Sequence, residues 1–175
     1  MRLNEQFFVF SRQAPHMVLR DARNEVWDDA RKEKERIIAV LCVDLIEKYH
    51  YRLPHLHVQE LIPIVSGAGW QYPEADILVE GIGGNPRLII KAIPHDTYHA
   101  DLVAGIEELF LLARAIPSRK TMPLYIIPYT RWYDAAHETK EEFIVINTSI
   151  FPTSESWIAA GRPTESGIPP REETA

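Results

Sequence analysis

The chain has 175 residues, 46% of them hydrophobic, a length that supports one domain burying about two-thirds of its unfolded surface. No apolar run reaches the ~20 residues of a spanning helix and no signal-peptide pattern opens the sequence, so we expect no membrane span and a cytoplasmic protein. A net charge of −6 argues against a protein that holds nucleic acid by bulk electrostatic attraction.

The acidic excess lies wholly in residues 61–175, because residues 1–60 carry ten basic and ten acidic side chains. If DNA binds, the N-terminal part is therefore expected to face it. The single cysteine, Cys42, lies in an apolar helical run, which excludes an intrachain disulfide and indicates a core thiol rather than a nucleophile.

The first predicted elements are a strand and a helix. The apolar run at 7–10 predicts a short strand or a docking segment. Residues 28–49 predict a helix capped by Asp28 or Asp29, and its nearly continuous apolar half is typical of a helix packed against a sheet. Residues 57–65 predict the next strand.

The stretch 73–94 predicts two antiparallel strands joined by a glycine turn. If the turn is centred on its Gly-Gly pair, simple counting places Asp76 opposite Lys91 and Glu80 opposite Arg87. An acid facing a lysine on adjacent strands is half of the residue set found in Mg²⁺-dependent phosphodiester-cleaving sites.

Residues 96–116 predict a second amphipathic helix, capped by Asp96 and ended by Pro117, and strands at 124–128 and 142–146 follow it. This order of elements predicts a single α/β domain with a central mixed sheet flanked by helices.

The composition divides the chain into three parts. Residues 1–17 form a lead-in and residues 18–151 form the α/β domain. Residues 152–175 are rich in Pro, Ser, Thr, Gly and Glu, which predicts a tail without a core of its own.

Several short motifs carry a resemblance to a known family. They are Arg23 before the first helix, Glu35 within it, LIEK at 45–48 followed by Tyr51, ADILV at 75–79, and KA at 91–92. In this order they resemble the PD-(D/E)XK nuclease superfamily, and in particular the small N-terminal nuclease module of type I restriction enzyme R subunits. The resemblance implies a restriction-endonuclease-like fold for residues 18–151.

In that family an aspartate, and a glutamate two residues before a lysine, hold Mg²⁺ or Mn²⁺, and the lysine orients the attacking water. The resemblance implies that Asp76 is the metal ligand and Lys91 the catalytic lysine, with Glu35 as a further catalytic candidate. The position of the second acid holds Ile89, whose alkyl side chain cannot ligate a hard cation.

Two other positions depart from the family pattern. The acid expected on the preceding strand falls on Gln59, with Glu60 one residue off register, and the glutamine expected on the following helix falls near Gly105. An acid on that helix, Glu107 or Glu108, could move into the place left by the missing glutamate. Glu80 could not, because four strand residues put it ~13 Å from Asp76.

Some of these residues have ordinary structural interpretations. Asp76 and Lys91 could form a cross-strand ion pair worth only ~0.2–1 kcal/mol, and Glu35 could lie on a solvated helix face. A basic and aromatic cluster could stack on nucleic-acid bases or contact a protein. That cluster comprises Tyr129, Arg131, Trp132 and Tyr133.

Two functions remain as alternatives. The first is a degenerate nuclease-fold subunit that needs no cofactor and binds a protein partner, with residues 152–175 as one route of attachment and DNA as a possible second partner. The second is an active Mg²⁺- or Mn²⁺-dependent DNA endonuclease, of restriction or repair type, with a relocated acid.

Overall fold

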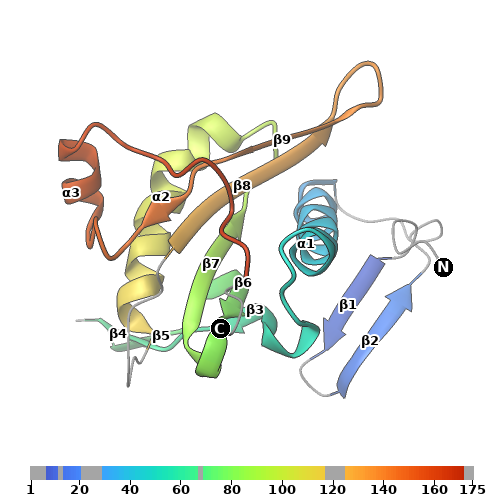
Figure 1. The fold of residues 1–175 in the computed structure, drawn as a ribbon, viewed down its shortest axis with the longest axis horizontal. Coiled ribbons are helices and arrows are strands. Elements are labelled where there is room, and N and C mark those ends of the chain that lie inside the picture. Colours follow the sequence, from blue (N-terminus) through green and yellow to red (C-terminus); the bar gives the residue numbers. More distant parts are fainter. Residues whose placement is uncertain (1–6, 12–13, 21–28, 67–68, 117–124, 172–175) are drawn as a thin grey trace.

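The computed structural model describes residues 7–11, 14–20, 29–66, 69–116 and 125–171. A central mixed β-sheet lies between helices in a single α/β domain, as the sequence predicts (Figure 1). Among the described residues, no helix combines the length and the apolar character needed to cross a membrane.

Six strands form the central sheet, in the order β10-β8-β7-β6-β3, and β9 pairs with the other half of β8. The strands are β3 (Leu56–Leu61), β6 (Glu74–Glu80), β7 (Pro86–Ala92), β8 (Tyr125–Tyr133), β9 (Thr139–Phe143) and β10 (Ile146–Asn147). β7 and β8 run parallel, whereas the other pairs in this sheet are antiparallel. A parallel pair needs a crossover connection, which here contains helix α2 (Tyr98–Ala115).

Each face of the sheet packs against its own helix. Helix α1 (Asp29–Glu47) covers one face and α2 covers the other, together with the short helix α3 (Ser154–Ala159) (Figure 1). Successive residues of β7 and β8 enter opposite cores: Ile90 and Ile127 pack on the α1 side, and Ile89 and Ile126 pack on the α2 side.

The first elements agree in part with the sequence. The run at 7–10 is confirmed as a strand, β1 (Phe7–Ser11), which pairs with β2 (Ala14–Arg20) beside α1. The prediction of one strand over 57–65 is wrong, because β3 ends at Leu61 and a separate hairpin of β4 (Ile64–Ser66) and β5 (Gly69–Gln71) follows. Pro63 lies at this break, and it has no backbone N–H to donate to a strand ladder.

Both long helices lie where the periodicity predicts them. Asp29 is the first residue of α1, and Asp28 lies outside the described residues. The predicted cap of α2 is wrong: its N-cap is Thr97, and no side chain caps the helix there. Cys42 is buried, and burial raises the pKa of its thiol from 9.0 to about 12, as expected for a core thiol.

The later strands differ from their predicted bounds. The strand predicted at 124–128 extends to Tyr133 as β8, and the stretch predicted at 142–146 is divided between β9 and β10. β8 runs further because its second half gains a partner in β9, with Tyr129 opposite Phe143 and Tyr133 opposite Thr139.

The segment after residue 152 packs against the domain. Its helix α3 has a capping box between Thr153 and Ser156, and it buries Trp157 in the α2-side core. The chain then crosses to the other core, where Ile168 is buried, and Tyr51 Oη donates to Pro169 O at 2.9 Å. This segment has no core of its own but contributes to both cores of the domain.

The docking of this segment gives a stability prediction. Ile168→Ala is expected to lower the free energy of unfolding by ~2–5 kcal/mol, because it removes a buried side chain from the α1-side core. Ile150→Ala is the control, since this side chain is 60% exposed and its loss should change stability by less than about 0.5 kcal/mol. Guanidinium denaturation measures both, and equal values would mean that the segment does not dock.

Candidate functional site

Asp76 lies in β6 and is 1% exposed. Its carboxylate accepts a hydrogen bond from the backbone N–H of Ala92, at the end of β7, with a distance of 2.8 Å from N to Oδ2. Its other oxygen, Oδ1, is 2.6 Å from the ammonium of Lys34 in α1. A buried carboxylate requires such partners, because water cannot solvate its charge.

No sequence motif indicates that Lys34 is the partner of Asp76. Lys34 lies in the highly charged first half of α1, the helix that covers one face of the sheet. The motifs point instead to the adjacent residue, Glu35. Which of these adjacent side chains meets Asp76 depends on how α1 is rotated against the sheet.

Lys91 pairs with a residue of α2 and not with Asp76. Its ammonium lies 2.7 Å from Glu108 Oε2. Gly105 makes room for this path: a Cβ added there would lie 3.4 Å from Lys91 Cδ and 3.0 Å from Ile93 Cδ1. A side chain at position 105, such as the glutamine expected near there, would therefore crowd Ile93 and touch the Lys91 stem.

The strand register explains part of this arrangement. The ladder between β6 and β7 pairs Ile77 with Ile90, and one further step in the same register sets Asp76 against Lys91. The simple ion pair between these two residues is nevertheless not formed, because each has another partner.

The second predicted cross-strand pair is wrong. The register shifts between Val79 and Glu80, so Glu80 lies opposite Pro86 and not opposite Arg87. Glu80 Oε1 instead lies 3.3 Å from Nε2 of His57 on the neighbouring strand. A single 3₁₀ turn with Gly83 at φ 76° joins the strands, in place of the symmetric two-residue turn that the counting assumed.

Ile89 fills the position where the resemblance implies an acid. It lies opposite Leu78, shares a strand face with Lys91 and is 0% exposed. Its neighbours in the α2-side core include Leu109 and Phe110. This position is therefore part of the core, with no opening to solvent.

The other candidate residues lie on α1, α2 and β3. Glu107 is exposed and lines a cavity beside α3, and Glu35 is half-buried in α1. Gln59 is exposed with φ 55°, and Glu60 lies opposite Ala75. Across the described ranges, no group of three His, Cys, Asp or Glu residues is arranged to hold a metal ion.

These contacts do not fit the two-acid metal site that the resemblance implies. The oxygens of Asp76 already contact an ammonium and a backbone N–H. Ile89, at the position of the second acid, supplies only an alkyl group. A hard divalent cation needs several oxygen ligands at one point.

The predicted basic and aromatic cluster is divided between the interior and the surface. Tyr129 is 0% exposed, and its hydroxyl donates to Glu141 at 2.7 Å. Burial, followed by the hydrogen bond and the charge of Glu141, raises the pKa of this phenol. Arg131 pairs with Asp44 of α1, and these contacts join α1 to β8 and β9.

The other two members of the cluster lie nearer the surface. Trp132 stacks on His95 with their ring centroids 3.8 Å apart, and Tyr133 is 57% exposed with the guanidinium of Arg36 5.5 Å from its ring. A partner would therefore meet Tyr133 and Arg36 before Tyr129 or Arg131.

A scan against protein-family models finds no match for the chain, and a search of curated proteins finds none either. The resemblance to the nuclease superfamily therefore rests on the residues quoted above.

The burial of Ile89 gives a prediction for this site. Ile89→Glu should lower the free energy of unfolding by ~4 kcal/mol or more, because it places an unpaired carboxylate in the α2-side core. Ile89→Val is the conservative control and should cost only ~0.5–1.5 kcal/mol. Urea denaturation measures both variants.

The opposite result would have a clear structural meaning. If Ile89→Glu is about as stable as Ile89→Val, the position opens to solvent and can accept the acid that the family carries there. Metal titration of that variant would then show whether the rest of the site is intact.

Proposed function

We propose that this protein is a degenerate member of the PD-(D/E)XK superfamily that acts as a binding or structural subunit of a larger assembly and does not cleave nucleic acid. The observation that carries this proposal is the burial of Ile89 in the α2-side core. Metal-assisted cleavage needs an ion that polarises a phosphoryl oxygen and acidifies a bound water. One buried aspartate that already contacts an ammonium is poorly suited to hold such an ion.

The pairing of the remaining charges also supports the proposal. Lys34 neutralises Asp76, and Glu108 neutralises Lys91. In an active site of this family the aspartate faces a metal ion and the lysine faces the reacting phosphate or water. Here both side chains have internal partners, so neither charge needs an external ligand to neutralise it.

A protein partner is the expected ligand of such a subunit. Residues 152–171 pack on their own domain, so the larger part of the proposed tail is already engaged. Exposed aromatic side chains offer other contact surfaces, because amphipathic rings are enriched in protein interfaces. They include Trp70, Tyr72 and Tyr133.

One observation favours the alternative, an active Mg²⁺- or Mn²⁺-dependent DNA endonuclease. Glu108 of α2 brings a carboxylate to Lys91, which places an acid from the following helix beside the lysine that matches the family motif. Activity would require this carboxylate to exchange Lys91 for a metal ion shared with Asp76.

Cleavage of plasmid and single-stranded DNA in Mn²⁺ tests the proposal. We expect no cutting by the wild-type protein whose folding has been verified by cooperative melting. The comparison set is Asp76→Ala, Glu108→Gln and the control Asp101→Ala, which changes an exposed acid of α2 outside the site.

Cutting that persists in Asp101→Ala but disappears in both Asp76→Ala and Glu108→Gln would contradict the proposal. It would establish the endonuclease with Glu108 as the relocated acid.

A further inference from the structure

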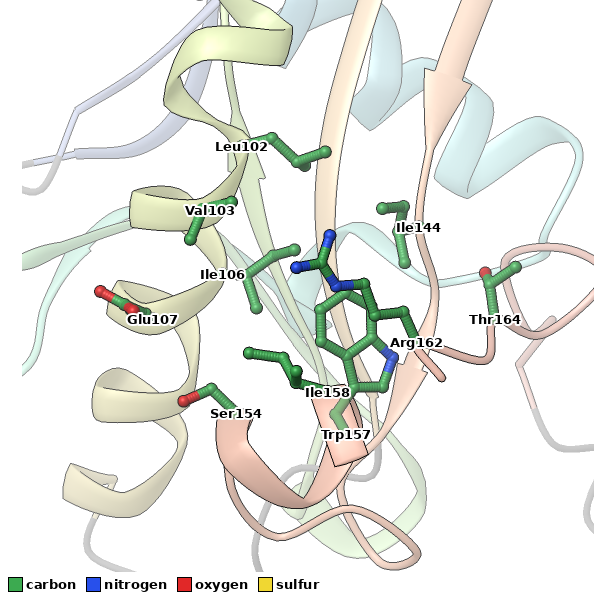
Figure 2. Close-up of a pocket in the computed structure, with 10 residues that line it drawn as sticks. All are labelled: Leu102, Val103, Ile106, Glu107, Ile144, Ser154, Trp157, Ile158, Arg162 and Thr164. Carbon is green, nitrogen blue, oxygen red and sulfur yellow. The ribbon is translucent and has the colours of Figure 1, made fainter. Parts of the chain in front are cut away.

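A cavity lies between α2, α3 and the chain that follows α3, on the side of the molecule away from α1 (Figures 1 and 2). Its volume is about 130 Å³, and its walls are mainly apolar. The apolar side chains that line it are Leu102, Val103, Ile106, Ile144, Trp157 and Ile158. A dry apolar cavity of about 150 Å³ can hold a benzene ring. This cavity therefore suits a group of similar size, such as a phenyl or a branched alkyl group.

Arg162 brings a positive charge to this apolar cavity. Figure 2 shows its side chain extending from the end of α3 across the cavity toward α2. Within the part of the chain that the structure describes, no carboxylate forms an ion pair with Arg162. The carboxylate of Glu107, the acid in the cavity lining, points away from the guanidinium in Figure 2.

The backbone holds Arg162 in an unusual conformation. Gly161 and Arg162 have φ values of 84° and 59°, and the left-handed region is unfavourable for a residue with a side chain. Gly161 N donates to Ile158 O and Arg162 N donates to Trp157 O, both at 3.0 Å, which is the hydrogen-bond pattern of a Schellman helix end. These bonds fix the start of the Arg162 side chain beside Trp157.

Local backbone strain of this kind is found at binding sites, where the surrounding contacts maintain it. The contacts are present here. Trp157 is buried, and its indole Nε1–H donates to Pro163 O at 2.8 Å, so the residues on both sides of Arg162 are held in place.

We propose that this cavity binds a carboxylate attached to a phenyl or branched alkyl group, with the apolar group in the cavity and the carboxylate on Arg162. A free small acid has this chemistry, and so does the C-terminal residue of a polypeptide that ends in Leu or Phe. The guanidinium can donate two parallel hydrogen bonds to a carboxylate. This inference is independent of the nuclease resemblance.

Binding of 4-methylpentanoate to the full chain tests the proposal. Amide chemical shifts in ¹⁵N-labelled protein report this binding. We expect saturable shifts centred on residues 157–164. Arg162→Gln should weaken this binding by about tenfold or more, the usual effect of losing a hydrogen bond to a charged group. The matched control is Arg52→Gln, which changes an exposed arginine of the 3₁₀ turn before β3 and should bind like wild type.

The amide 4-methylpentanamide, which has the same shape without the charge, should bind the wild type about as weakly as the acid binds Arg162→Gln. Two peptides ending in Leu, one with a free carboxylate and one amidated, distinguish the sources. Tighter binding of the free-carboxylate peptide than of the small acid assigns the site to a partner's C-terminus, and the reverse order assigns it to a small molecule.

Two results would overturn the proposal. One is the absence of saturable shifts in residues 157–164 with both the acid and the free-carboxylate peptide. The other is equal binding of the acid by wild type and Arg162→Gln. Neither result bears on DNA cleavage, so failure here is separate from failure of the proposed function.

Discussion

The buried carboxylate of Asp76 is the constraint on which this end of the sheet depends. Its charge cannot stay in the interior without partners, and the two it has come from different elements. The N–H of Ala92 ties it to the end of β7, and the ammonium of Lys34 ties it to α1. One side chain of β6 thereby fixes the neighbouring strand and one covering helix relative to the sheet.

The departures from the nuclease pattern are physically consistent with one another. Ile89 extends the α2-side core to a position where the family places a solvated acid. Gly105 lets the Lys91 stem pass against α2 and reach Glu108. Asp76 and Lys91, which would face a ligand in such a site, here form two internal ion pairs, and this supports the proposed binding or structural role.

The sequence predicts the elements whose signals are local. The apolar periodicity of α1 and α2 and the paired strands around the glycine turn are correctly predicted, as is the α/β class. It does not predict the partner of Asp76, because several charged residues of α1 are equivalent until the helix packs. Nor does it predict docking of residues 152–171, since Trp157 and Ile168 are the only side chains of this segment in the two hydrophobic cores.

A titration with Mn²⁺ tests most directly whether Asp76, which is paired with Lys34, can hold a metal ion. Paramagnetic broadening of amide resonances in ¹⁵N-labelled protein would locate any bound ion, with Asp76→Asn as the reference. The pairing of Asp76 with Lys34 predicts no selective broadening at Lys91 and Ala92 at millimolar Mn²⁺. Saturable broadening centred on those amides and abolished in Asp76→Asn would contradict it and would show that the site still binds a metal.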